Sequence, residues 1–263
     1  MKTSVTVYSL RDYFARGLLD VPKFIELVAE MGAEGVDLGY YWRSRKERKE
    51  AKKKLSESGL ELAIYITSSD FSKPKVEERK AEIEKAKKSI LEAKEMEAAM
   101  LRVHPGDLKP GVNPVEAEQW VSESLAEVAD FAAGEGIVIA VENHGRYFSG
   151  ADVMERLFKA DKRLRLVFDT GNFTLEGDDP VTAAEKLAKW VVHVHAKDRD
   201  EKGRMCSPGE GIIDFEKICR ILSDEGFSGF YSVEYEGWRD QLLGVGLGIG
   251  YLKALHLKRG ILK

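Results

Sequence analysis

The sequence predicts a (β/α)8 TIM barrel formed as a single domain over residues 1–263. Short apolar runs of strand length alternate with longer segments of helical character, and eight such pairs follow one another along the chain. No composition break divides them, and 263 residues with 43% apolar side chains suffice for one such domain. An open, doubly wound sheet is the competing fold, but no glycine-rich phosphate loop follows the first run.

The expected strands are eight compact or alternating apolar runs, rich in β-branched and aromatic residues. In chain order they are VTVYSL, GVDLGYY, LELAIYITS, AAMLRVHP, GIVIAVEN, LRLVFDT, VVHVHAK and GFYSVEYEG. Because a helical segment follows each run, the strands are expected to be parallel and to close into a barrel.

The expected helices begin after capping residues and end before glycines. They span residues 20–31, 44–58, 75–97, 114–134, 151–160, 179–189, 214–225 and 239–257. The third combines strong helix formers with Glu to Lys pairs four residues apart. The N-caps are Asp20, Asn113 and Asp214, and the glycines just past helix ends are Gly32, Gly59, Gly134 and Gly226.

Composition favours a small-molecule substrate and a cytoplasmic protein. The 41 basic and 45 acidic residues give a net charge of −4, which argues against a nucleic-acid surface. No apolar segment follows Met1 as in a signal peptide, and no stretch is long enough to span a bilayer, so no membrane partner is expected. The two cysteines, Cys206 and Cys219, lack metal-site spacing and are expected to be free thiols.

Four polar residues stand at the ends of the last four runs: Glu142, Asp169, His195 and Glu234. Counting back along each strand places bulky aliphatic side chains on the alternate, helix-facing positions, so all four are expected to point into the barrel. They would lie at the carboxyl end of the strands, where barrel enzymes carry their active sites. A single carboxylate at a strand end is more often a cap or an ion-pair partner, but three carboxylates and one imidazole of common parity predict a metal site.

The chemistry of this set suits one divalent ion. Carboxylate oxygens and an imidazole nitrogen are ligands for Mn²⁺, Mg²⁺, Co²⁺ or Zn²⁺, and the ligands alone do not choose among these ions. A cation relieves the repulsion between three carboxylates. Two adjacent oxygens of a hydroxy-carbonyl substrate could occupy the remaining coordination positions of the cation. The cation would then polarise the carbonyl and acidify the neighbouring C–H bond. A carboxylate could then remove the proton and another group return it.

The motifs EN, DTGN, HAKD and VEYEG, in this order, resemble the xylose isomerase-like TIM-barrel superfamily, which includes sugar phosphate isomerases and epimerases and AP endonuclease family 2. The resemblance implies that Glu142, Asp169, His195 and Glu234 are metal ligands, with Glu142 and Glu234 also the catalytic acid/base pair. It implies an isomerase or epimerase of carbohydrate metabolism that acts on a small sugar or related hydroxy-carbonyl compound. A homodimer or homotetramer is also implied.

Two positions depart from the family pattern. Asn172 stands where many relatives have a histidine, and it suits a sugar hydroxyl better than a metal. Glu201 stands where the epimerases have an arginine, which Arg199 or Arg204 would have to replace.

Six residues are candidates for substrate contact. They are His104, Asn172, His193, Lys197, Glu210 and Trp238. For His193 a hydrogen-bonded core histidine is the alternative, for Lys197 a salt bridge with a rim carboxylate, and for Trp238 simple packing.

Three other functions stay open. A metal-dependent dehydratase would use the same metal site and α-proton abstraction but expel a β-hydroxyl. An endonuclease IV-like repair enzyme is suggested by HPG at 104–106, but its metal cluster needs more histidines than the five in this chain provide. A non-catalytic sugar-binding barrel would bind metal without turning over a carbohydrate.

Overall fold

The computed structural model describes the backbone of residues 1–261 and the side chains of residues 1–258. The chain forms two compact units, each with its own strands and covering helices. The first unit comprises Met1–Ala63 and the chain from His193 onward, and the second comprises Ile64–Val192. Both boundaries fall inside strands, at 61–66 and 191–196; the former strand pairs with a strand of the second unit and the latter with a strand of the first. No helix within the described residues is both long and apolar enough to cross a membrane.

The first unit contains parallel strands in the order β2-β1-β10-β7. These strands are β1 (Lys2–Thr6), β2 (Gly35–Gly39), β7 (Val191–Ala196) and β10 (Phe230–Val233). Its helices are η1 (Val7–Leu10), α1 (Arg11–Ala15), α2 (Val21–Glu30), α3 (Arg45–Ser58), α8 (Phe215–Asp224) and α9 (Gln241–Ile261). A short antiparallel hairpin, β8 (Asp198–Arg199) with β9 (Met205–Cys206), follows β7.

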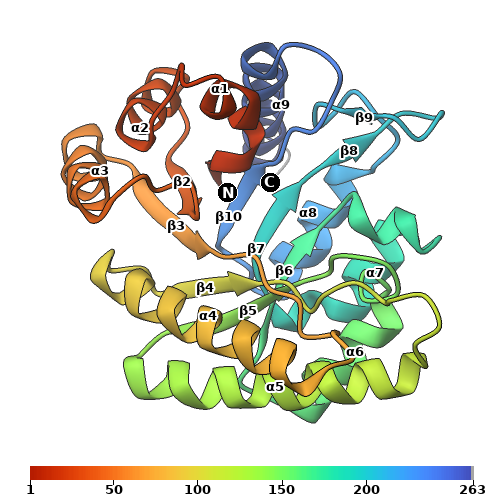
Figure 1. Ribbon diagram of the computed structural model, residues 1–263. Helices are drawn as coiled ribbons and strands as arrows, with labels where there is room; N and C mark the ends of the chain where they lie inside the picture. The colour runs from red at the N-terminus through yellow and green to blue at the C-terminus, as the bar shows by residue number, and fades with distance from the viewer. Residues whose placement is uncertain (262–263) are drawn as a thin grey trace. The chain divides into compact units, whose positions relative to one another are not determined.

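The second unit contains parallel strands in the order β3-β4-β5-β6, with α4 packed beside α5 (Figure 1). These strands are β3 (Glu61–Ile66), β4 (Met100–Val103), β5 (Val138–Glu142) and β6 (Arg165–Asp169). Its helices are α4 (Val76–Glu95), α5 (Pro114–Glu135), α6 (Ala151–Ala160), η2 (Asn172–Leu175), α7 (Pro180–Leu187) and η3 (Ala188–Trp190).

All eight expected strands and all eight expected helices are present, and the three predicted N-caps are confirmed. The side chains of Asp20, Asn113 and Asp214 each accept a hydrogen bond from a backbone N–H in the first turn of the following helix. One predicted helix end is wrong. Gly134 lies inside α5, and the left-handed residue that ends this helix is Gly136, at φ 74°.

The first predicted strand is too long, because VYSL at Val7–Leu10 forms the 3₁₀ helix η1. Ser9 explains the change. Its hydroxyl donates to the carbonyl oxygen of Val233 at 2.9 Å and accepts from the backbone N–H of Tyr235 at 2.9 Å. These bonds hold the chain against the end of β10, and it leaves the strand path there. Helix α1 and the β8–β9 hairpin were not predicted.

Aliphatic side chains at alternate strand positions form the helix-covered core, as the parity argument expected. Ile139, Val141, Leu166 and Phe168 are all buried. Polar side chains at the remaining positions are buried too, and they gather at the carboxyl ends of the strands. These buried polar groups form the candidate site.

Candidate metal centre and active site

Glu142 ends β5 and is buried among polar partners of the second unit. Its Oε2 lies 3.2 Å from Nε of Arg102 and 3.4 Å from Nε2 of His104. Its Oε1 accepts a hydrogen bond from Nδ2 of Asn172 at 3.3 Å. Two predicted substrate contacts, His104 and Asn172, therefore touch the predicted catalytic glutamate, and Arg102 stabilises its charged form.

The imidazole of His104 stacks on that of His144, with ring centroids 4.0 Å apart. Together with Glu142 these histidines offer ligand atoms within 4.8 Å of one another. Burial and the positive charge of Arg102 lower the pKa of His104 to about 3, although Glu142 opposes the shift. His104 is therefore neutral at neutral pH, and it is a hydrogen-bonding group there, not a cation.

Asp169 ends β6 and is fully buried. Its Oδ1 accepts backbone N–H groups of Gly171 and Asn172, each at 2.8 Å, which fixes the orientation of the carboxylate. The Asn143 amide donates to the backbone carbonyl of Asp169 at 3.0 Å and accepts from its N–H at 2.8 Å. Asn143 therefore ties the residue after Glu142 to the end of β6, and both predicted ligands of this unit stand at neighbouring strand ends.

His195 on β7 is the predicted imidazole ligand and is fully buried in the first unit. Its Nδ1 lies 2.9 Å from Oε2 of Glu234, the residue that follows β10. Two ligand atoms at right angles on an ion with bonds of 2.0–2.2 Å stand about 3 Å apart. The His195 and Glu234 pair therefore fits one shared divalent ion.

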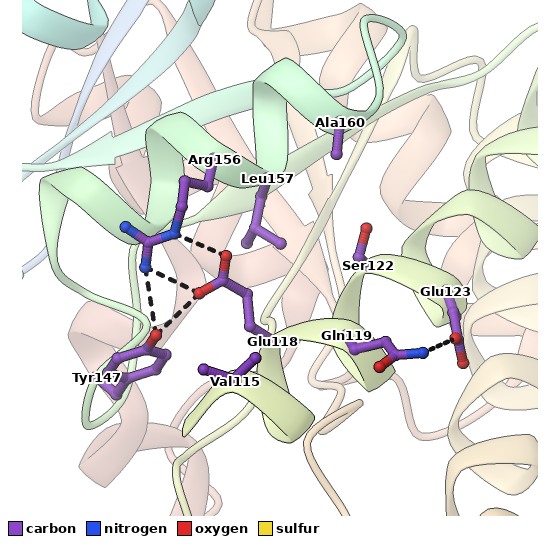
Figure 2. Close-up of a pocket in the computed structure, with 9 residues that line it drawn as sticks. All are labelled: Val115, Glu118, Gln119, Ser122, Glu123, Tyr147, Arg156, Leu157 and Ala160. Carbon is purple, nitrogen blue, oxygen red and sulfur yellow. Dashed lines mark hydrogen bonds and ion pairs between the residues drawn. The ribbon is translucent and has the colours of Figure 1, made fainter. Parts of the chain in front are cut away.

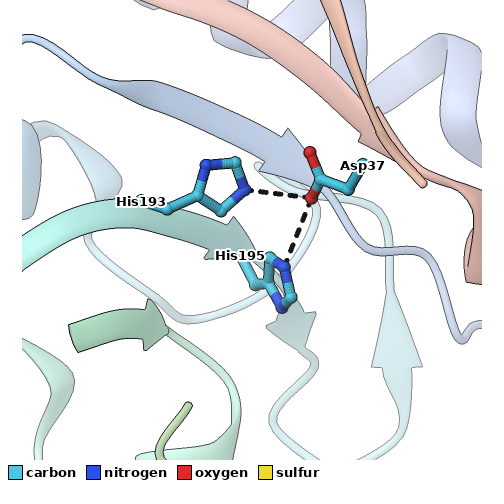
Figure 3. A group of neighbouring side chains, drawn as sticks. All are labelled: Asp37, His193 and His195. Carbon is cyan, nitrogen blue, oxygen red and sulfur yellow. Dashed lines mark hydrogen bonds and ion pairs between the residues drawn. The ribbon is translucent and has the colours of Figure 1, made fainter. Parts of the chain in front are cut away.

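Asp37 on β2 was missed in the sequence, and it joins the two histidines of β7 (Figure 3). Its Oδ2 lies 2.9 Å from Nε2 of His193 and 3.3 Å from Nε2 of His195. Burial raises the pKa of Asp37, but electrostatic attraction and hydrogen bonding from the imidazoles of His193 and His195 outweigh burial and hold the pKa well below its usual value. The available signal was a single carboxylate inside the apolar run GVDLG.

Lys197 lies beyond His195 and is almost fully buried. Its Nζ is 3.5 Å from Oε2 of Glu234 and 3.1 Å from Oε1 of Glu236. The salt bridge with a rim carboxylate, one of the two roles expected for Lys197, is therefore present. The ammonium group stabilises the charge of Glu234, as Arg102 does for Glu142.

The loop after β7 is held by Asp198. Its carboxylate accepts four backbone N–H groups, from Arg199, Gly209, Gly211 and Ile213. The loop carries Glu210, which pairs with Arg239.

The remaining predicted residues lie around this loop. Trp238 is 70% exposed and carries the Arg239 guanidinium over its ring at 5.2 Å. Arg199 donates to the carbonyl of Gly203, and Arg204 pairs with Asp200. Both predicted substitutes for the family arginine thus make contacts within the hairpin, and Arg239 is a further arginine that the sequence did not single out.

A separate surface cavity of about 560 Å³ lies between α5 and α6 (Figure 2). On its wall Arg156 forms a paired contact with Glu118, whose carboxylate also accepts the Tyr147 hydroxyl at 2.8 Å. Tyr147 belongs to the loop after β5 and has a left-handed backbone, at φ 72°. The predicted site residues do not line this cavity. The hydrogen bond from Tyr147 to Glu118 ties the loop that carries His144 to α5.

Comparison with known proteins relates the chain to one family. A sequence profile of the xylose isomerase-like TIM barrel matches residues 25–255. An inosose dehydratase from Geobacillus thermodenitrificans is 28% identical over 81% of this chain and 82% of its own length. An uncharacterized protein from Methanocaldococcus jannaschii is 27% identical over 76% of this chain and 72% of its own length. An inosose dehydratase from Clostridium beijerinckii aligns over a shorter stretch, 45% of this chain and 48% of its own length, at 29% identity.

Solved structures share the fold at lower identity. A D-tagatose 3-epimerase-like protein has a TM-score of 0.79 at 23% identity and covers 98% of this chain and 99% of its own. A probable 3-DHS dehydratase from Bacillus anthracis has a TM-score of 0.80 at 18% identity and covers 96% of this chain and 99% of its own. With the family profile, these likenesses confirm the predicted (β/α)8 TIM-barrel fold.

Proposed function

Because the chain belongs to the xylose isomerase-like TIM-barrel family, we propose that it is a divalent-metal-dependent isomerase or epimerase. Its substrate would be a small sugar or a related hydroxy-carbonyl compound. The reaction would move a proton next to the substrate carbonyl, which is the chemistry that two carboxylates and one cation supply.

The proposed ion ligands are Glu142, Asp169, His195 and Glu234. Three observations support the set: the family barrel, the position of each residue at a strand end, and the separation of 2.9 Å between His195 and Glu234. Manganese, magnesium, cobalt and zinc all suit these donors. The bound ion would polarise the carbonyl and orient two substrate oxygens.

The observation that carries the assignment is the matched surroundings of the two proposed acid/base residues. Oε2 of Glu142 has a guanidinium at 3.2 Å and an imidazole at 3.4 Å. Oε2 of Glu234 has an ammonium at 3.5 Å and an imidazole at 2.9 Å. Each carboxylate therefore lies beside one cationic side chain and one imidazole, and in the proposed reaction one carboxylate serves as the base while the other returns the proton. An epimerisation that removes a proton from one face of a carbon and returns one to the other face can use such a pair.

The other predicted contacts fit supporting roles in this proposal. His104 and Asn172, beside Glu142, would bind substrate hydroxyl groups, and Lys197 would do so beside Glu234. Glu210 and Trp238 stand on loops that follow β7 and β10, where they would line the entrance. His193, which contacts Asp37, suits support of the ligand histidine better than substrate contact.

A second candidate is a dehydratase of the same family. The inosose dehydratase from Geobacillus thermodenitrificans, which aligns over most of both chains, favours it. This reaction would begin with the same proton abstraction and end with loss of a β-hydroxyl, so one more group would have to protonate the departing oxygen.

One experiment separates the two reactions. The metal-supplemented protein is incubated in deuterated water with ketoses, their phosphates and inososes, and products are followed by NMR and mass spectrometry. An isomer carrying one solvent deuterium without loss of water supports the main proposal, and a product that has lost water supports the dehydratase. Binding of metal without any turnover would contradict both and favour a sugar-binding barrel.

Two substitutions test the roles of the carboxylates. Glu142→Gln and Glu234→Gln should each reduce turnover by roughly two to four orders of magnitude, the usual contribution of a general acid or base. Glu201→Gln, on the exposed turn of the hairpin, is the matched control and should retain full activity. Equal activity in all three variants would refute the acid/base assignment.

A further inference from the structure

Asp37 is a fully buried carboxylate whose two oxygens have different partners. Oδ1 accepts the Ser4 hydroxyl at 3.2 Å. Oδ2 lies 2.9 Å from Nε2 of His193 and 3.3 Å from Nε2 of His195, the two imidazoles of β7 (Figure 3). Both histidines are fully buried as well, so bulk water does not compete for these contacts.

These contacts indicate which ring nitrogen carries the proton. An ionised carboxylate only accepts hydrogen bonds, so Nε2 of His193, which is hydrogen-bonded to Asp37, carries a proton, and Nε2 of His195 faces the same oxygen at 3.3 Å. A neutral imidazole with a proton on Nε2 keeps its lone pair on Nδ1. In His195 this Nδ1 faces Oε2 of Glu234 at 2.9 Å. Two electron-rich atoms at that distance repel each other unless a proton or a cation lies between them.

We propose that Asp37 is a positioning residue of the metal centre, which holds His195 with Nε2 protonated and Nδ1 directed at the cation. The inference rests on the proposed function, because it specifies how one ligand of the proposed ion is oriented. A carboxylate behind a ligand histidine is a recurrent way to fix the ring and to raise the basicity of the ligand.

His193 has a place in the same arrangement. Its Nδ1 has no hydrogen-bond partner within the described residues, so its polar contact is the one that Nε2 makes with Asp37. A buried carboxylate that loses a donor is costly, and His193 therefore keeps Asp37 charged and oriented toward His195.

The first measurement needs no substitution. In ¹⁵N-labelled protein, the imidazole nitrogens of His193 and His195 are assigned by long-range NMR correlation, without metal and with diamagnetic Zn²⁺. We expect protonated Nε2 on both rings in each state, and a change confined to Nδ1 of His195 when Zn²⁺ is added. An unprotonated Nε2 on His195, or Zn²⁺ bound through Nε2, would overturn the inference.

The second measurement compares Asp37→Asn with Ser4→Ala, which removes a contact to the other oxygen of the same carboxylate. Mn²⁺ affinity is measured by calorimetry and stability by urea unfolding. Asp37→Asn should weaken Mn²⁺ binding by roughly 10- to 100-fold, as the loss of such supporting groups usually does. Ser4→Ala should leave the affinity nearly unchanged. Equal affinities in both variants, with only stability altered, would mean that Asp37 has a structural role and would refute the proposal.

The failures of the two proposals are distinguishable. A protein that binds Mn²⁺ with the expected dependence on Asp37, but turns over no carbonyl substrate, contradicts the proposed function and supports the positioning role. Turnover that depends on metal, with NMR showing Nε2 of His195 as the ligand, contradicts the positioning role alone. Absence of stoichiometric metal from the wild-type protein contradicts both.

Discussion

Replacing Asp198 by asparagine removes one of the two carboxylate oxygens that accept backbone hydrogen bonds from the loop after β7. In the wild-type protein Oδ1 accepts N–H groups of Arg199 at 2.8 Å and Ile213 at 3.3 Å. Oδ2 accepts those of Gly209 at 2.9 Å and Gly211 at 3.0 Å. The asparagine carbonyl preserves one of these pairs, while its amide NH₂ group is itself a donor and faces the other pair.

The magnitude follows from the bonds lost. A hydrogen bond to a charged group contributes about 1.5 to 3 kcal/mol, so loss of two costs about 3 to 6 kcal/mol. Burial raises the pKa of Asp198 although the four backbone N–H groups oppose it, so the buried charge itself costs the folded state some free energy. Asparagine removes that cost, and we expect a net loss of about 2 to 4 kcal/mol.

The assay is urea unfolding of the variant beside Asp200→Asn, measured from midpoints at equal slope. Asp200 lies in the same hairpin and also accepts two backbone N–H groups, but its side chain is 25% exposed, whereas Asp198 is fully buried, so its replacement should cost less. Turnover should fall with Asp198→Asn as well, since the loop carries Glu210. A loss equal to that of the control, or below about 1 kcal/mol, would refute the reasoning.

Three further predictions concern pH, backbone and metal. The lowered pKa of His104 means that the folded protein binds a proton at this imidazole less well than the unfolded chain does, so the stability contributed by His104 is present above pH 6.5 and is lost as the pH falls toward 3. In metal-free protein, His104→Gln should reduce the pH dependence of the unfolding free energy by up to about 1.4 kcal/mol per pH unit, as measured by urea unfolding. Gly145→Ala should lower the unfolding free energy far more than Gly203→Ala in the same assay. Both glycines have a positive φ, but a Cβ at position 145 would lie 2.3 Å from the carbonyl oxygen of Gly106, whereas a Cβ at position 203 would meet no atom within 4 Å. Chelation should lower the melting temperature, and resupply of metal at about 100 times its dissociation constant should restore about 2.7 kcal/mol; an unchanged melting temperature would contradict the metal site.

Local rules predicted most of the fold. Strand and helix periods identified the elements in their order, and short polar side chains identified three N-caps, because each of these signals acts within one turn or one strand. Errors occurred where distant residues decide. The segment after Thr6 is helical because Ser9 bonds to the end of β10, more than two hundred residues away in sequence.

The candidate site shows the same division. Strand parity singled out Glu142, Asp169, His195 and Glu234, since side-chain direction in a strand depends only on position along it. The contact between Arg102 and Glu142 was not predictable, because it depends on side-chain conformation across two strands. Trp238 was predicted to contact substrate, yet its exposure depends on how the loop after β10 runs.

The sequence by itself determined the order of the elements and the set of polar strand ends, because period, capping and parity are properties of neighbouring residues. Only the tertiary structure decided which of these groups form hydrogen bonds and ion pairs with one another. Asp37 is one carboxylate in an apolar run when read along the chain, and it acquires its partners because hydrogen bonding across β2, β1, β10 and β7 brings it to the two histidines. Hydrogen bonds and ion pairs act over a few ångströms in space, so only folding can specify them.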